Sequence, residues 1–510
     1  MQKDPIVCEI RCPVHGFIGL TDFERRIVDS SPFQRLRRIK QLAWTDYVYP
    51  GATHSRFEHS LGVMHVATRL FDAIVEKSDP LLRKVYGYND SGLARSRQIV
   101  RLAALLHDIG HPPFSHATEA LLPMKVAGQY SLIPERDVEP QQYKHEDYSV
   151  AIIEGPLAEI IVGHPSNKRN FNIKPDEVSA LLLGKKAGPS LFWKEIISGQ
   201  LDADRMDYLL RDSLHAGVSY GKYDLSRIIS SICAIERPSE ESKEPKVAVM
   251  KGGAYAVEAL IVARYWMHKQ VYFHKTRIAC NFHLQMAMTE ILKSESMADT
   301  YPSPDTPEQL ESFLKWDDFR VMGLLVGGKG GEHGERLMNR DHYRLVCEIE
   351  SLDTSVSEMD RSIKRSDTIV KAIGSSVTHV YRPKRPEWYK SVANDELILV
   401  DDESRLQIRY LSSYSALIKS INIGSQLFVY ADKVDAKNAK ALYEEFLNNE
   451  AKEARSAEKA LKEAQDNASL ISRVAKDGVA PGAQLEIPPL EVGKTVQPEI
   501  LTHKGVPNVG

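Results

Sequence analysis

Residues 105–116 read Leu105-Leu106-His107-Asp108-Ile109-Gly110-His111-Pro112-Pro113-Phe114-Ser115-His116 and place ionisable side chains at the end of an apolar segment. In residues 98–106 the apolar side chains recur three and four positions apart, which predicts a helix with one face turned toward a core. A glycine and two prolines in the stretch then end that helix. His107 and Asp108 therefore lie at the buried end of a helix, where charged groups are costly unless they are paired.

This His-Asp pair can place an imidazole nitrogen and a carboxylate oxygen on one divalent cation, a combination that suits iron, manganese or zinc. A buried histidine bonded to its neighbouring aspartate is the alternative, so a metal site needs further ligands. His59 shares a helical stripe with apolar residues, and Asp204 shares a helical face with Asp212. Two nitrogens and two carboxylates from separate helices would bind one metal and leave positions for water and substrate.

The composition is that of a cytoplasmic, soluble enzyme of about two or three domains. The 510 residues are 43% hydrophobic, and Lys+Arg 66 against Asp+Glu 69 gives no global basic field, although local nucleic-acid binding stays open. The five cysteines include no CxxC pair, so we expect reduced thiols. We find no signal peptide and no run of about 18 apolar residues, and we expect no membrane association.

The sequence around the four candidate ligands resembles a known family. The order H…HD…D is the pattern of HD-domain phosphohydrolases. Five longer motifs resemble those of the deoxynucleoside triphosphate (dNTP) triphosphohydrolases, which include bacterial dNTPases and dGTPases. These motifs are residues 35–42 (RLRRIKQL), 47–52 (YVYPGA), 56–62 (RFEHSLG), 107–116 (HDIGHPPFSH) and 144–146 (KHE).

The resemblance implies metal-dependent hydrolysis of a dNTP to the deoxynucleoside and tripolyphosphate. The implied metal is Fe, Mn, Zn or Mg, and its implied ligands are His59, His107, Asp108 and Asp204. The implied catalytic residues are His111, His116, His145 and Glu146. His111 and His116 would donate hydrogen bonds or a proton to the leaving oxygen, while His145, backed by Glu146, would face the attacking water.

Eight positions match family residues that contact the substrate: Gln41, Leu42, Arg56, Arg205, Tyr208, Asp212, Arg264 and Tyr272. By this resemblance the three arginines hold the triphosphate, Tyr208 stacks under the ribose and Asp212 accepts from the 3′-hydroxyl. A ring against C2′ would exclude a 2′-hydroxyl and select deoxynucleotides. Phe273 stands where a family glutamine touches the base edge, so a guanine preference does not carry over.

Regulation and assembly are further implications of the resemblance. Asp29, Gln34 and Arg37 fit the family's activator-nucleotide pocket, but the same polar residues could simply cap and solvate a helix. Cys8 and Glu9 depart from the basic and small apolar residues expected there. A homo-oligomer, such as a tetramer, is the family's usual assembly.

The predicted fold is mainly α: a helical HD-domain phosphohydrolase core over 1–320 and a smaller α+β lobe over 321–446 for oligomerisation or regulation. A charged helix and then a disordered tail fill 447–510. We expect one helical region over 255–293 and a flexible glycine-rich insertion at 327–334. Strands are expected at 396–400, 405–411 and 426–431.

Two other classes of function remain open from the residues. A phosphodiesterase or nuclease acting on oligonucleotides or cyclic dinucleotides could use the same metal chemistry. A non-catalytic nucleotide sensor or scaffold is the second alternative, although all four ligands and the histidine set are present.

Overall fold

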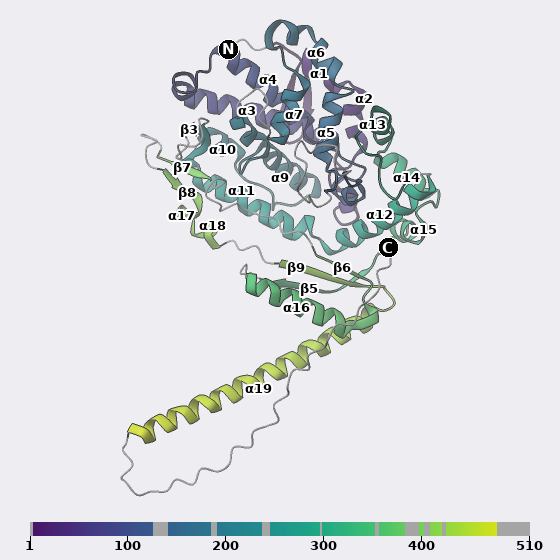
Figure 1. Ribbon diagram of the computed structural model, residues 1–510, viewed down its shortest axis with the longest axis vertical. Coiled ribbons are helices and arrows are strands. Elements are labelled where there is room, and N and C mark those ends of the chain that lie inside the picture. The colour runs from purple at the N-terminus through teal and green to yellow at the C-terminus, as the bar shows by residue number, and fades with distance from the viewer. Residues whose placement is uncertain are drawn as a thin grey trace, which may run out of the picture. The chain divides into compact units, whose positions relative to one another are not determined.

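The structure is a computed structural model, which describes residues 4–125, 141–184, 191–236, 245–295, 298–351, 356–382, 397–401, 408–420 and 425–476. The chain divides into two units, Met1–Tyr443 and Glu444–Gly510. Helices dominate the first unit, and its described residues also form three small sheets (Figure 1), so the prediction of a mainly α fold with a smaller α+β region is confirmed. The predicted disordered tail beyond residue 476 lies outside the described residues.

The helices are α1 (Asp22–Val28), α2 (Ser31–Gln34), α3 (Arg56–Lys84), α4 (Asp90–Leu106), α5 (His145–Glu154), α6 (Ala158–Gly163), α7 (Pro175–Leu183), α8 (Glu195–Ser198), α9 (Ala203–Ala216), α10 (Leu225–Ser231), α11 (Ala254–Met267), α12 (Lys275–Ser294), α13 (Pro307–Leu314), α14 (Asp318–Val326), α15 (Gly331–Met338), α16 (Val356–Ile373), α17 (Leu411–Tyr414), α18 (Ala416–Ser420) and α19 (Ala436–Lys476). The strands are β1 (Ile6–Cys12), β2 (Gly16–Thr21), β3 (Ile232–Ile235), β4 (Lys246–Met250), β5 (Arg344–Ser351), β6 (His379–Tyr381), β7 (Ile398–Val400), β8 (Ile408–Tyr410) and β9 (Ser425–Ala431).

Helix α4 carries the His-Asp pair at its C-terminal end. It begins at Asp90, where the Asn89 side chain caps the helix by accepting from the backbone N–H of Gly92. The apolar stripe predicted from the sequence is fully buried, and His107 is the C-cap residue. The helix therefore ends inside the core with its last side chains among the neighbouring helices.

A buried ion pair ties α4 to the start of α1. Thr21 is the N-cap of α1 and forms a capping box with Glu24. The Glu24 carboxylate accepts from Arg101 Nε at 2.5 Å and from its second nitrogen at 2.6 Å. Burial works against the charge on Glu24, but Arg101 outweighs it and holds the pKa of the carboxyl below its usual value.

Helices α3 and α9 approach so closely that only a glycine fits between them. A Cβ on Gly62 would lie 1.9 Å from Oδ1 of Asp207 and 2.4 Å from the guanidinium of Arg211. The missing side chain therefore lets the two helices bring His59 and Asp204 together.

The predicted helical region over 255–293 is interrupted. A π-helical turn at His268–Tyr272 separates α11 from α12, and its wider winding aims the Tyr272 hydroxyl at Asp212, 2.6 Å away. The glycine-rich segment 327–334 is also not a flexible insertion throughout. Helix α15 begins inside it at Gly331, because Gly328 and Gly331 adopt the positive φ values, 77° and 57°, of a tight turn.

The three expected strands are present as β7, β8 and β9, but they join two different sheets. β7 and β8 extend the β3–β4 hairpin, and β4 pairs with β7 in parallel through Ala248–Ile398 and its neighbours. β9 lies between β5 and β6 in a sheet that sits between α12 and α16 (Figure 1). All five cysteines are free, and none of the described helices is long and apolar enough to cross a membrane.

Candidate functional site

Two imidazoles and two carboxylates converge where α3, α4 and α9 meet. Nε2 of His59 lies 3.0 Å from Oδ1 of Asp204 and 3.4 Å from Oδ2 of Asp108. Nε2 of His107 lies 3.3 Å from the same Asp108 oxygen and 3.6 Å from the same Asp204 oxygen. The four ligands expected from the sequence therefore lie together, although they come from positions 59 to 204.

Both histidines present Nε2 to the centre because their other nitrogens are already used. Nδ1 of His59 donates to Oδ2 of Asp207 at 2.8 Å, and Nδ1 of His107 donates to the carbonyl of Ala104 at 2.9 Å. The two Nε2 atoms are buried and have no hydrogen-bond partner among the described residues. An oriented, unpartnered Nε2 beside carboxylates is the usual arrangement of metal-binding histidines, so these residues fit a divalent metal.

The local charge also favours a cation. Burial opposes a charge on His59, yet Asp108, Asp204 and Asp207 raise its pKa well above the usual value. Burial likewise opposes the charge on Asp204, but His107 and His59 lower the pKa of its carboxyl. The carboxylates that would hold protons on these rings would hold a metal ion in the same place.

Arg56 contacts one of the four candidate metal ligands, Asp108. This side chain is 2% exposed and lies at the start of α3, where it donates to Asp108 and, at 2.7 Å, to the hydroxyl of Ser115. Burial opposes the charge on Asp108, but Arg56 holds the pKa of its carboxyl well below the usual range. The structure thus places Arg56, expected to bind phosphate, in contact with a metal-ligand candidate.

Asp207 is a residue that the sequence analysis did not single out. It is fully buried and accepts from His15 Nε2 at 2.6 Å and from two Arg211 nitrogens at 2.8 Å each, besides His59. The i,i+4 spacing of Asp207 and Arg211 was the local signal for a helical ion pair. The contacts with His15 and His59 depend on the tertiary fold.

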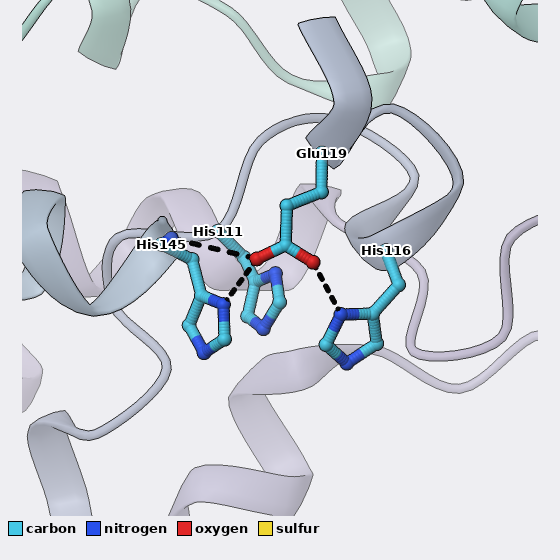
Figure 2. A group of neighbouring side chains, drawn as sticks. All are labelled: His111, His116, Glu119 and His145. Atoms are coloured by element: carbon cyan, nitrogen blue, oxygen red, sulfur yellow. Dashed lines mark hydrogen bonds and ion pairs between the residues drawn. The ribbon is translucent and has the colours of Figure 1, made fainter. Parts of the chain in front are cut away.

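A second cluster lies directly beside the first. The carboxylate of Glu119 sits between two rings, 2.5 Å from Nδ1 of His145 and 2.8 Å from Nδ1 of His116 (Figure 2). His111 stacks on His145 with ring centroids 3.8 Å apart. Nε2 of His145 lies 3.9 Å from Oδ1 of Asp108, so the second cluster adjoins the candidate metal ligands.

The charges in this second cluster differ from ring to ring. Burial opposes protonation of His145, but Glu119 and then Glu146 raise its pKa. Burial and the nearby Arg56 hold the pKa of His111 well below its usual value. Glu119, spaced three residues after His116, was missed by the sequence analysis, whereas the expected Glu146 lies farther from His145 Nδ1, at 3.4 Å.

A glycine and an aspartate fix the backbone between the two clusters. A Cβ on Gly110 would lie 2.2 Å from the carbonyl of His145, so its absence lets α5 reach the His-Asp turn. Phe114 and Ser115 both have positive φ, 56° and 59°. Asp318 of α14 holds this turn by accepting from the backbone N–H of Phe114 at 2.7 Å.

The expected sugar-contacting residues also lie together. Asp212 accepts from the Tyr272 hydroxyl at 2.6 Å and lies 2.7 Å from Nε2 of His54. Tyr208 meets Tyr272 edge-on with centroids 6.1 Å apart. Gln41 borders this group, because its backbone N–H donates to the carbonyl of His54 at 3.0 Å.

Two of the three expected arginines, Arg205 and Arg264, lie near Tyr208. Burial raises the pKa of the Tyr208 hydroxyl to about 12 against the opposing charges of Arg264 and Arg205, so both cations lie near this ring. Arg205 also pairs with Asp202 at 2.7 Å. Leu42 is 5% exposed and belongs to the apolar core.

The three residues expected in an activator pocket make local contacts. Arg37 donates to Gln34 at 2.9 Å and lies over the ring of Phe57 at 3.5 Å, while Asp29 is 3.6 Å from Arg25. Such contacts would also be expected if these three residues only capped and solvated a helix and bound no nucleotide. The activator pocket stays a prediction.

Comparison with known proteins gives two family matches. Residues 56–211 match the HD domain and residues 224–458 match the HD associated region. An uncharacterized protein of Methanocaldococcus jannaschii is 38% identical over 283 residues, which cover 55% of this chain and 49%, about half, of that protein. A protein named deoxynucleoside triphosphate triphosphohydrolase SAMHD1 homolog from Dictyostelium discoideum is 28% identical over 396 residues, 73% of this chain and 68% of that protein.

Among solved structures, a hypothetical protein from Aquifex aeolicus has a TM-score of 0.63 and 28% identity. The match covers 85% of this chain and 99% of that chain. The structural similarity thus includes the C-terminal region as well as the helices that carry the candidate site.

Proposed function

The chain contains an HD domain followed by an HD-associated region and is distantly homologous to dNTP triphosphohydrolases of the SAMHD1 type, and on this premise we propose that it hydrolyses dNTPs to deoxynucleosides and tripolyphosphate. The observation that carries the proposal is the convergence of the His59 and His107 Nε2 atoms on the carboxylates of Asp108 and Asp204. The name of the Dictyostelium relative supplies the substrate class.

In this proposal His59, His107, Asp108 and Asp204 hold the divalent metal. Their nitrogen and carboxylate donors suit iron, manganese or zinc, and Mg²⁺ is the fourth candidate. When bound, such a metal would polarise a phosphoryl oxygen and activate a water molecule for attack on the α-phosphorus. Asp207 and the Ala104 carbonyl keep the two imidazoles oriented, and Arg56 holds Asp108 in place.

In this proposal the second cluster, formed by His111, His116, Glu119 and His145, carries out the proton transfer. Glu119 accepts from Nδ1 of His145 and raises the pKa of this ring, which favours its protonated form, and Nε2 of the ring faces Asp108. The oxygen of the activated water bonds to the α-phosphorus and the bond from phosphorus to the 5′-oxygen breaks, so the proton must go to the 5′-oxygen of the leaving deoxynucleoside. We assign this donation to His145 in place of His111 and His116, and His111 supports the His145 ring by stacking. His116 is the more exposed ring and takes the outer phosphate side, and Glu146 stands behind His145.

The substrate's deoxyribose and triphosphate lie on opposite sides of Tyr208 in this proposal. Asp212 accepts from the 3′-hydroxyl, while Tyr208 and Tyr272, with Gln41 and Leu42, close around the sugar and exclude a 2′-hydroxyl. Arg205 and Arg264 bind the negative charge of the triphosphate.

Activation and assembly complete the proposal. An activator nucleotide would bind at Asp29, Gln34 and Arg37, and the working form would be a homo-oligomer such as a tetramer. Activity that appears only in nucleotide mixtures would support the activator, and light scattering with and without nucleotide measures the assembly.

The direct experiment is incubation of the purified protein with each dNTP and NTP, singly and mixed, with Mn²⁺ or Mg²⁺. Deoxynucleoside and tripolyphosphate, resolved by chromatography and mass spectrometry, are the expected products. Nucleoside monophosphate, inorganic phosphate or no product in any mixture would overturn the proposal. Cleavage of oligonucleotides or cyclic dinucleotides would then be tested in its place.

The matched variant is Asp204→Ala. The Asp204 side chain is 35% exposed, whereas that of Asp108 is 6% exposed. The fold is therefore expected to survive removal of the Asp204 carboxylate. Loss of both hydrolysis and bound metal with an unchanged circular dichroism spectrum is expected. Full activity in this variant would contradict the assigned metal ligand.

A further inference from the structure

A cavity of about 670 Å³ opens beside the Asp207 network and is not used by the proposed reaction. It is lined by Val14 and His15 at the β1–β2 turn, by Arg69 of α3, by Leu210 of α9 and by residues 222–226. This volume lies within the range of about 300–1,000 Å³ that is common for small-molecule sites.

The polar lining of the cavity is predominantly cationic. Arg69 and Lys222 both face it, and neither forms an ion pair with a carboxylate within the described ranges of the chain. The lining includes one acid, Asp224, whose carboxylate caps α10 by accepting from the backbone N–H of Arg227 at 2.9 Å. A guanidinium and an ammonium together favour a phosphate group.

The remaining lining is suited to the organic part of a ligand. Val14, Leu210 and Leu225 supply apolar surface, and the Tyr223 ring is held in place because its hydroxyl donates to the carbonyl of Met206. A phosphate-bearing small molecule would therefore find both charge and apolar contact here.

His15 connects this cavity to the metal centre. Its Nε2 lies 2.6 Å from Oδ1 of Asp207, and Oδ2 of the same carboxylate accepts from Nδ1 of His59 at 2.8 Å. Only two residues, both buried, thus separate the cavity from a metal-ligand candidate. A ligand against His15 would move the imidazole that bonds Asp207, and so the carboxylate that orients His59.

We propose that this cavity binds a phosphate-bearing anion and that its occupancy changes metal binding at His59 through His15 and Asp207. The site is distinct from the reaction centre and from the candidate activator pocket. Because binding requires no turnover, it can be tested whether or not the chain hydrolyses dNTPs.

The first measurement is calorimetric titration of the full chain with inorganic phosphate, tripolyphosphate and deoxyadenosine monophosphate. Arg69→Ala combined with Lys222→Ala should weaken one saturable binding event about tenfold or more. The matched control is Lys168→Ala combined with Arg169→Ala, which removes the same charges from an exposed segment and should bind normally. The exposed single change Lys222→Glu tests the site without disturbing α3.

The three probes identify the ligand's source. Binding of phosphate and tripolyphosphate alone would indicate an inorganic anion, and preferential binding of deoxyadenosine monophosphate would indicate a nucleotide. No saturable binding of any probe, or equal binding by wild type and both cavity variants, would overturn the proposal.

The second measurement is Mn²⁺ affinity by chelator competition with and without the bound anion. A several-fold shift in the wild type that is absent from the Arg69→Ala, Lys222→Ala variant is expected. An unchanged Mn²⁺ affinity in a wild type that binds the anion would overturn the coupling through His15.

Discussion

Nδ1 of His59 donates a 2.8 Å hydrogen bond to the carboxylate of Asp207. This bond selects the tautomer that exposes the Nε2 lone pair to the metal centre. In Asp207→Asn an amide replaces a carboxylate that serves His15, His59 and Arg211 at once. We expect metal affinity to fall by about 10- to 100-fold, measured by competition with a chelator.

Asp90→Asn is the control for this prediction, because it removes a carboxylate that is exposed and paired with Arg83 far from the centre. Its metal affinity should equal that of the wild type. An Asp207→Asn protein that keeps wild-type metal affinity would show that His59 needs no orienting partner.

Glu119 should contribute more to turnover than Glu146. Its carboxylate lies 2.5 Å from Nδ1 of His145, whereas that of Glu146 lies 3.4 Å away. Glu119→Gln therefore weakens the hydrogen bond that is the largest influence raising the pKa of His145, and we expect kcat to fall by about 100-fold or more. Glu146→Gln is the matched comparison, and steady-state kinetics measures both.

The pH profile gives the direction of the Glu119 effect. Glu119 raises the pKa of His145, so its loss lowers that pKa and moves the alkaline limb of the rate profile to lower pH. Equal losses in the two glutamine variants, with unshifted profiles, would assign Glu119 no special part in catalysis.

Gly62→Ala should strongly destabilise the protein. The added Cβ would lie 1.9 Å from Asp207 Oδ1, so α3 and α9 must separate or the buried ion pair with Arg211 must break. We expect a loss of about 3 kcal/mol or more in the free energy of unfolding. Thermal and denaturant unfolding followed by circular dichroism measure this loss.

Gly163→Ala is the matched control, since its Cβ would meet nothing within 4 Å. A change of less than about 1 kcal/mol is expected there. If Gly62→Ala were as stable as Gly163→Ala, the close approach of the two helices would not be required by the fold.

The buried carboxylate of Glu24 should make an acid-sensitive contribution to the free energy of unfolding. Arg101 holds the folded pKa of Glu24 below the unfolded value of 4.5. Its contribution is therefore complete above pH 4.5 and is lost as the pH falls through the folded pKa. The unfolding free energy of Glu24→Gln should be lower than that of the wild type at neutral pH and vary less with pH on the acid side.

Denaturant titrations from neutral pH to well below pH 4.5 compare the two proteins. Parallel pH dependences for wild type and Glu24→Gln would assign the acid sensitivity to other carboxylates.

Local sequence patterns predicted the elements that carry the site. The apolar spacing before His107 predicted α4, and the helical spacing placed Asp204 and Asp212 on one face of α9. These features depend on side chains within a few turns of one helix, which is the range that periodicity and capping report.

The roles of Asp207 and Glu119 were not predicted, because they depend on contacts with residues distant in the sequence. Asp207 meets His15 across 192 positions, and Glu119 meets His145 across 26, so no local periodicity marks either contact. The π-helical turn that ends at Tyr272 was missed for another reason, because its residues also suit an α-helix and its bond to Asp212 spans 60 positions.

The parallel pairing of β4 with β7 has a consequence for synthesis on the ribosome. β4 ends at Met250, while its partner begins at Ile398. At translation rates of about 5–20 residues per second, the nascent β4 waits roughly 7 to 30 s with one strand edge unpaired. Throughout that interval the emerging chain offers a template for intermolecular β-pairing, so chaperone dependence should be greatest for ribosome-bound chains that stop between these two strands.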